Sequence, residues 1–341
     1  MVSSLGATLP VHPVDLAPFR EGRDGDRAAV AAALDAACRD SGFLVITGHG
    51  VAPELAAATL DAFGAFFDLP VEEKRAASVA DQSANRGYTE IGTEGLAYSL
   101  GEETPPDLFE AFNVGREDAG HAYFDAHRSF YAPNVWPARP TDLRDTWLEY
   151  ERAVSGTQDV LLRAMAVALD LPDSWFVDRS RRAIVTTRAI NYERAAGAPS
   201  PLPDQMRMGQ HTDYGLVTIL LADPVPGLQI FRAGRWHDVV PPPGAFICNI
   251  GDMLARWTND RWTSTLHRVV PPPAHADGPV RRRSIARFLD CEPDLVVECI
   301  PSCTSADDPP RYEPVVAGEW LMAKVLGGRT RERTHLPQGA S

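Results

Sequence analysis

QHTDYGLVTILL (residues 210–221) and RRRSIARFLD (residues 281–290) set the architecture of this chain. Both stretches are rich in β-branched and apolar residues, which favour extended strands. Similar short runs, separated by prolines and glycines, recur through the second half of the chain: AIVTTRAINY (183–192), GLQIFR (227–232), WHDVVP (236–241), GAFICNIG (244–251) and HRVV (267–270). Several short strands at such close spacing predict a β-sandwich or a small barrel.

The first half of the chain is dominated by helical periodicity. Residues 42–51 (GFLVITGHGV) are an exception, because a β-rich run closed by glycines predicts a buried strand and a turn. Residues 80–120 are expected to be an extended loop region with short elements. We predict one structural unit in which a mainly helical region, residues 1–180, packs on a β-barrel core, residues 181–330. Helices are expected at residues 26–40, 53–67, 141–170 and 318–328.

The composition limits the classes of partner. The net charge of −13 argues against nucleic acid and anionic membrane surfaces. The five cysteines are an odd number in a long chain, so no disulfide scaffold is expected. The N-terminus lacks a basic stretch followed by an apolar core, and no run of about 18 apolar residues occurs. We expect a cytoplasmic protein that acts on a small molecule, and the sequence leaves its oligomeric state open.

The tripeptide HTD at residues 211–213 is a candidate metal-binding motif. Residues i and i+2 of an extended segment point to the same side, so His211 and Asp213 can converge on one point. His267, in the β-rich run 266–270, can supply a third ligand from another strand. Two imidazoles and one carboxylate on one face of an octahedron form the facial triad of non-haem Fe(II) oxygenases. A surface His–Asp pair and a zinc site that activates water for hydrolysis are the alternatives.

The arginine-rich run RRRSIARF (281–288) is a candidate anion site. An inward-facing arginine requires an anion, because an unpaired buried charge is costly. A guanidinium and a neighbouring hydroxyl could together bind one end of a dicarboxylate. A structural salt bridge is the alternative, and a shift of one residue in register would turn Arg281 or Arg283 inward. One strand face would carry a cation, a hydroxyl, a small residue and a ring: Arg282, Ser284, Ala286 and Phe288.

Two further residues lie at the end of the β-rich run 183–192. The hydroxyl of Tyr192 could complete the carboxylate site, with Asn191 beside it. The alternative is that Tyr192 is a core residue, because aromatic residues favour strands.

Eight segments together resemble the isopenicillin N synthase-like family of Fe(II)/2-oxoglutarate oxygenases over nearly the whole chain. In the first half they are GFLVITGHGV (42–51), FFDLPVEEKR (66–75), NRGY (85–88) and NVWP (134–137). In the second half they are QHTDYGLVTILL (210–221), GLQIF (227–231), CNIGDMLARWTND (248–260) and STLHRVV (264–270). The resemblance implies a mixed α/β fold with a double-stranded β-helix (jelly-roll) core and N-terminal and flanking helices.

The resemblance also implies roles for individual residues. It assigns iron to His211, Asp213 and His267. It assigns 2-oxoglutarate to Arg282 and Ser284, with help from Tyr192 and Asn191. Arg86, in NRGY, would approach the substrate carboxylate, and a structural salt bridge is the alternative for it. The chain departs from the family pattern at Glu193, where a proline is usual, and in a proline-rich insertion at residues 271–280.

The function that the resemblance implies is the oxidation of a small molecule with Fe(II), 2-oxoglutarate and O₂. Hydroxylation, desaturation and cyclisation are all open outcomes, and the substrate is expected to be amino-acid-derived or a secondary metabolite, as in antibiotic biosynthesis. One alternative is an isopenicillin N synthase-type oxidase that uses Fe(II) and O₂ without 2-oxoglutarate. Another is a non-catalytic jelly-roll module that only binds metal.

Overall fold

The computed structural model describes residues 11–81, 84–101, 104–117, 122–193, 201–202, 204–272 and 281–334. The proline-rich insertion predicted at 271–280 lies outside the described residues, apart from its first two positions. In the described part, none of the helices combines the length and the apolar character needed to cross a membrane.

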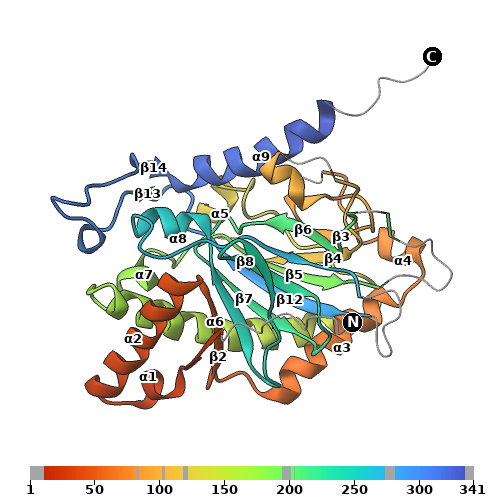
Figure 1. The fold of residues 1–341 in the computed structure, drawn as a ribbon. Coiled ribbons are helices and arrows are strands. Elements are labelled where there is room, and N and C mark those ends of the chain that lie inside the picture. The colour runs from red at the N-terminus through yellow and green to blue at the C-terminus, as the bar shows by residue number, and fades with distance from the viewer. Residues whose placement is uncertain are drawn as a thin grey trace, which may run out of the picture.

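A large and a small β-sheet form the centre of the molecule (Figure 1). The large sheet contains eight strands and is antiparallel except for the parallel pair β1 and β2. The sheet therefore joins strands from both halves of the chain. In order across the sheet the strands are β1 (His12–Asp15), β2 (Phe43–Thr47), β10 (Phe246–Ile250), β7 (Val217–Ala222), β12 (Arg283–Leu289), β5 (Val185–Asn191), β4 (Glu110–Gly115) and β3 (Gly87–Thr89).

The small sheet has four strands, and a separate hairpin lies near the C-terminal end. The predicted jelly-roll core with flanking helices is confirmed by the two sheets and the helices around them. The division of the chain at residue 180 stays a prediction. The small sheet runs β6 (Met208–His211), β11 (His267–Val269), β8 (Leu228–Arg232) and β9 (Arg235–Asp238), and the hairpin pairs β13 (Val296–Val297) with β14 (Val315–Val316).

Strand alternation gives the large sheet two distinct faces. Its outer face packs in the larger apolar cluster, together with residues of the helices, and includes Ile219, Phe246 and Ile285. Its inner face shares the smaller apolar cluster with the small sheet, as Ile190 and Ile230 show. Successive residues of a strand point to opposite faces, so each strand contributes to both clusters. Functional side chains on the inner face therefore lie between the two sheets.

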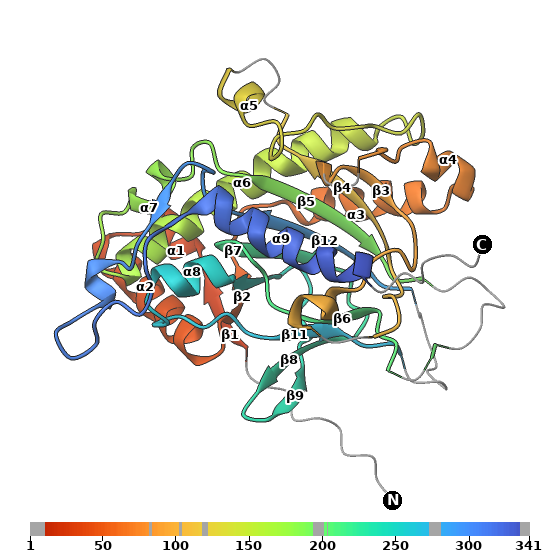
Figure 2. The same cartoon turned by 90° about the horizontal axis from the view of Figure 1, so that it is seen from above.

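The helices cover the sheets from two sides. The helices predicted at 26–40, 53–67, 141–170 and 318–328 are confirmed as α2, α3, α6 and α9. Figures 1 and 2 show α1, α2 and α3 on one side of the sheets and α9 crossing the opposite side. The helices are α1 (Ala17–Glu21), α2 (Asp24–Asp40), α3 (Pro53–Phe67), α4 (Val71–Arg75), η2 (Leu96–Leu100), α5 (Ala122–Ala126), α6 (Leu143–Ala168), α7 (Trp175–Asp178), α8 (Asp252–Trp257), η3 (Pro301–Cys303) and α9 (Ala317–Thr334).

A buried ion pair ties the outer face of the large sheet to α6. Arg287 of β12 is 3% exposed, and its Nη2 donates to Glu151 at 2.7 Å and to Ser155 at 3.0 Å. The same guanidinium also donates to Gln158. The helix thus supplies a carboxylate and two polar groups to one buried cation, which satisfies its charge and most of its donors.

We predict that Arg287→Met lowers the free energy of unfolding by about 3 kcal/mol, because it leaves Glu151 largely buried without its counter-ion. The measurement is urea-induced unfolding followed by circular dichroism. Arg144→Met is the matched control, since Arg144 also lies on α6 but makes a half-exposed ion pair with Glu117. The control should cost less than about 1 kcal/mol. Equal losses for the two variants would contradict the importance of the buried pair.

Candidate metal centre

His211, Asp213 and His267 meet between the two sheets. His211 ends β6 and His267 begins β11, and the two residues are direct partners across the antiparallel pair. Asp213 lies in the irregular segment that follows β6. All three side chains are buried, and one ligand atom from each lies within 4.8 Å of the others. The predicted i, i+2 spacing and cross-strand ligand therefore do bring the three residues together.

Hydrogen bonds to the backbone fix the orientation of both imidazole rings. The Nδ1–H of His211 donates to the carbonyl of Gly209 at 2.8 Å, and that of His267 donates to Thr265 at 3.1 Å. In each ring this leaves Nε2 as the ligand atom, 3.7 Å from Oδ1 of Asp213. Burial and then the nearby His267 lower the pKa of His211 to about 4, which keeps that imidazole neutral and able to bind metal.

The two oxygens of the Asp213 carboxylate have different partners. Its Oδ2 accepts hydrogen bonds from the Thr218 hydroxyl and, at 2.6 Å, from the Asn249 amide. Oδ1 remains free to face the two rings. Burial alone would raise the pKa of Asp213, but the two histidines and these two hydrogen bonds together hold it below its usual value. The inner faces of β7 and β10 thus orient the carboxylate and keep it ionised.

This donor set fits a divalent transition metal. Two imidazole nitrogens and one carboxylate oxygen converge from one side, and they can occupy one face of an octahedron. The remaining positions would be open to small ligands. Such a set also binds zinc, so the geometry by itself does not choose the metal.

The anion site has the register in which Arg282 faces inward. Its Nη1 donates to Ser284 at 3.2 Å, and its guanidinium lies 5.1 Å from the centre of the Tyr192 ring. Arg281 and Arg283 turn to the outer side instead, where they pair with Asp68 and Asp61. Arg282 is 2% exposed, and within the described residues its Nε has no hydrogen-bond partner. A buried guanidinium with a free donor is suited to a carboxylate ligand.

Tyr192 and Asn191 point to opposite faces, as neighbouring residues of an extended segment do. Tyr192 lies in the inner cluster beside Arg282, and burial raises its pKa. Asn191 turns outward, where its amide donates to Glu110 at 2.8 Å and its carbonyl accepts from Arg281 at 2.9 Å. The structure therefore brings Tyr192, and not the side chain of Asn191, to the anion site.

Arg86 is held by backbone carbonyls. It is 3% exposed, and its guanidinium donates to Ala132 at 3.0 Å, to Asn85 at 2.9 Å and to Phe130 at 3.3 Å. Burial lowers its pKa to about 10. These contacts favour a structural role, and the expected contact with a substrate carboxylate stays a prediction.

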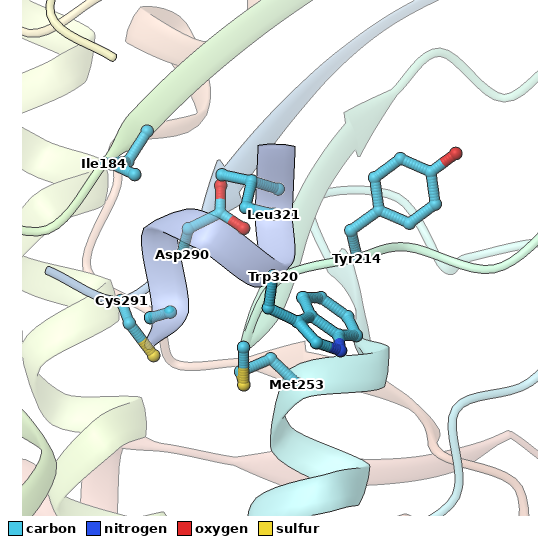
Figure 3. A pocket seen from close by; sticks show the side chains of 8 residues that line it. Ile184, Tyr214, Met253, Asp290, Cys291, Trp320 and Leu321 are labelled. Carbon is cyan, nitrogen blue, oxygen red and sulfur yellow. The ribbon is translucent and has the colours of Figure 1, made fainter. Parts of the chain in front are cut away.

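Four polar residues in or near the site were not singled out from the sequence. Thr218 and Asn249 hold Asp213, and Arg188 of β5 makes an ion pair with Glu94 at 2.7 Å. Asp290, directly after β12, faces a cavity beneath α9 (Figure 3). Each of the four is a polar residue inside a β-rich run, and that pattern is the only signal that could have marked them.

Burial raises the pKa of Asp290 to about 7, and the nearby Asp213 adds to the shift. An exposed aspartate has a pKa of about 4. At a pH between these two pKa values, Asp290 is protonated more often in the folded protein than in the unfolded chain. The free energy of unfolding should therefore fall as the pH rises through this window.

Two family models match the chain. The model described as "non-haem dioxygenase in morphine synthesis N-terminal" matches residues 11–139, and that of the "2OG-Fe(II) oxygenase superfamily" matches residues 186–290. The second match contains the three candidate metal ligands and the residues around Arg282. Together the two matches span both halves of the chain.

Curated relatives and a solved structure agree with these matches. The chain is 35% identical over 317 residues to the 2-oxoglutarate-Fe(II) type oxidoreductase hxnY of Emericella nidulans, which covers 90% of this chain and 87% of the relative. It is 32% identical over 335 residues to validamycin A dioxygenase of Streptomyces hygroscopicus subsp. limoneus, with 96% and 89% covered. The crystal structure of a full-length Neurospora crassa protein in complex with alpha-KG superposes with a TM-score of 0.81 at 29% identity, covering 96% of this chain and 98% of that one.

We predict that Thr218→Val and Asn249→Leu each weaken Fe(II) binding about 10- to 100-fold, because Asp213 loses a hydrogen bond that orients it. Anaerobic titration of the metal-free protein with Fe(II) measures the effect. Thr187→Val is the matched control, since the Thr187 hydroxyl lies on the outer face near Glu151. Unchanged iron affinity in both inner-face variants would show that these hydrogen bonds do not tune the site.

For Asp290 we predict that the stability of the metal-free wild type falls by on the order of 2 kcal/mol as the pH rises from about 5 to about 8. The Asp290→Asn variant lacks the titrating group and should lose much less over the same range. Thermal and urea unfolding across this pH range provide the comparison. Parallel pH profiles for the two proteins would rule out a raised pKa at Asp290.

Proposed function

The chain belongs to the 2OG-Fe(II) oxygenase superfamily and is an Fe(II)- and 2-oxoglutarate-dependent dioxygenase of small molecules, and we propose that His211, Asp213 and His267 are its iron ligands. One observation carries this assignment. The Nδ1 atoms of both rings and Oδ2 of Asp213 are engaged in hydrogen bonds, which leaves Nε2, Nε2 and Oδ1 directed at one another. Iron bound there supplies, with 2-oxoglutarate and O₂, the oxidising chemistry.

We further propose that Arg282 binds the far carboxylate of 2-oxoglutarate. The Ser284 hydroxyl lies within hydrogen-bond distance of the guanidinium, and the Tyr192 ring packs beside it. The buried Nε of Arg282 would gain a partner when the carboxylate enters. A guanidinium matches a carboxylate in two parallel hydrogen bonds, so the same contact would also fix the orientation of the co-substrate. Asn191 has no part in this proposal, because its side chain is engaged on the outer face.

The alternatives are less well supported. Relatives named as 2-oxoglutarate-Fe(II) oxidoreductases and a solved structure in complex with alpha-KG favour the use of 2-oxoglutarate over an oxidase that omits it. They also favour an enzyme over a module that only binds metal. Zinc hydrolysis has no support among these relatives.

For the substrate we propose an amino-acid-derived compound or a secondary metabolite. The similarity to validamycin A dioxygenase of a Streptomyces supports a role in antibiotic biosynthesis. The net charge of −13 argues against nucleic acid as the substrate. We also propose that the protein works in the cytoplasm, where its five free cysteines would stay reduced.

The test is an anaerobic titration of the metal-free protein with Fe(II) and then with 2-oxoglutarate, followed by the visible charge-transfer band of the chelate. We expect the band in the wild type and no band in His211→Ala. Arg282→Met should keep iron binding but require at least about tenfold more 2-oxoglutarate, because a charge-assisted hydrogen bond is lost.

Arg283→Met is the matched control, because Arg283 directly follows Arg282 in the chain but pairs with Asp61 on the outer side. It should titrate like the wild type. Iron binding that survives His211→Ala would contradict the ligand assignment. Equal 2-oxoglutarate affinities of Arg282→Met and Arg283→Met would contradict the anion site.

A further inference from the structure

Arg188 of β5 lies on the inner face of the large sheet. Ala189 belongs to the outer apolar cluster and Ile190 to the inner one, and successive residues of a strand alternate between the two faces. The side chain of Arg188 therefore points between the two sheets. It is 15% exposed although β5 lies between β12 and β4, so the exposed part of this side chain faces the space between the sheets.

The strand register places Arg188 near the candidate metal centre. Arg188 pairs across the sheet with Ala286, which in turn pairs with Leu220. Leu220 is two residues from Thr218, whose hydroxyl donates to Asp213. From the usual strand spacing and rise, the Cα of Arg188 lies roughly 10 Å across the sheet and about 7 Å along it from that of Thr218. Arg188 and the metal centre therefore share one face of the sheet.

Glu94, from the segment between β3 and η2, forms an ion pair with Arg188. Its Oε2 accepts a hydrogen bond from Nη2 of Arg188 at 2.7 Å, and the Glu94 side chain is 32% exposed. Within the described part of the chain, no hydrogen bond engages Oε1 of Glu94 or Nη1 of Arg188, and neither atom is fully buried. The pair therefore retains one acceptor and one donor for a ligand.

Hydrogen bonds connect the Glu94 segment to the strand that carries His211. The carbonyl of Glu94 accepts from the N–H of Asp107 at 2.8 Å, and Oδ1 of Asp107 accepts from the N–H of Gly209 at 2.9 Å. The carbonyl of Gly209 in turn accepts from Nδ1 of His211 at 2.8 Å. Burial lowers the pKa of His211, and the positive charge of Arg188 adds to this shift. The ion pair is thus fixed beside the metal centre.

The two charges of this pair favour a ligand that carries both signs. An anion bound at Nη1 of Arg188 would lie beside the Glu94 carboxylate, and a cation bound at Oε1 of Glu94 would lie beside the guanidinium. Each would gain one attraction and meet one repulsion of similar size. A zwitterion with adjacent charges would gain both attractions, with a charge-assisted hydrogen bond at each end. An α-amino acid carries its ammonium and carboxylate groups on one carbon and so has such adjacent charges.

We propose that Arg188 and Glu94 determine specificity by binding the carboxylate and the ammonium group of an α-amino acid substrate. The inference rests on the proposed function and narrows its substrate class to free amino acids. Arg188 then takes the role that the sequence suggested for Arg86, whose guanidinium is held by backbone carbonyls. Because the pair lies on the inner face beside the metal centre, the side chain of the bound amino acid can extend from it toward the iron.

The experiment uses the full-length protein loaded anaerobically with Fe(II) and 2-oxoglutarate. The chelate band is recorded first, so that a failure of the proposed function is seen separately from a failure of amino-acid binding. The probes are the standard α-amino acids and two derivatives of the tightest binder. The N-acetyl derivative lacks the positive charge, and the carboxamide lacks the negative charge. Binding is measured by calorimetry and by the change that each probe causes in the chelate band.

We expect the tightest-binding amino acid to bind the wild type at least about tenfold more tightly than either derivative, because each derivative loses a charge-assisted hydrogen bond. Arg188→Met should bind this amino acid about as weakly as the wild type binds its carboxamide. Glu94→Gln should bind it about as weakly as the wild type binds the N-acetyl derivative, and it provides a second variant should Arg188→Met fold poorly. Arg75→Met is the matched control and should bind like the wild type, since Arg75 pairs with Glu90 at the same distance of 2.7 Å but on the surface.

Three results would overturn the proposal. The first is a normal chelate band with no binding of any amino acid, which would leave the proposed function intact and the ion pair as a structural contact. The second is a derivative that binds the wild type as tightly as its parent amino acid, which would show that the site does not recognise both charges. The third is amino-acid binding that is unchanged in both Arg188→Met and Glu94→Gln, as expected if the amino acid coordinates the iron directly.

Discussion

The carboxylate of Asp213 is the group on which the candidate centre depends. A buried charge must be satisfied by hydrogen bonds or by a metal, and here each oxygen has a separate role. Thr218 and Asn249 engage Oδ2 from two strands of the large sheet, while Oδ1 faces His211 and His267 on the small sheet. The site therefore exists only when both sheets are assembled face to face.

Strand alternation extends this arrangement over the whole molecule. The outer face of the large sheet packs with the helices, and its one strongly buried cation among the described residues, Arg287, is paired with α6. On the inner side, directly before the same strand, Arg282 has no ion pair within the described part of the chain. Charges on the outer face thus stabilise the fold, whereas charges left unpaired on the inner face are available to ligands. This contrast separates the structural Arg287 from the candidate ligand-binding Arg282.

Local patterns were sufficient to find the residues whose role depends on spacing along the chain. The i, i+2 relation of His211 and Asp213, and that of Arg282 and Ser284, follow from the period of a strand, and the structure shows both pairs on shared faces. The β-rich runs after residue 183 and the helical periodicities likewise became strands and helices at nearly the expected positions. For residues 80–120 the sequence predicted an extended loop region with short elements and did not single out the strand β4. The reason is that β4 is short and its apolar residues are interrupted by Glu110 and Asn113.

Other features were decided by tertiary structure, because they depend on contacts between segments far apart in the sequence. Asn191 and Arg86 lie in motifs that suggested a role in ligand binding. The side chain of Asn191 instead forms hydrogen bonds with Glu110 and Arg281, and that of Arg86 donates to backbone carbonyls of a loop distant in the sequence. Asn249 becomes a partner of Asp213 only because β10 pairs with β7, and Asp290 faces a cavity only because α9 covers the end of β12. Sequence spacing sets which face of a strand a side chain occupies. The groups that contact a side chain on that face are decided by how the sheets and helices pack, because burial and pairing are properties of the assembled core.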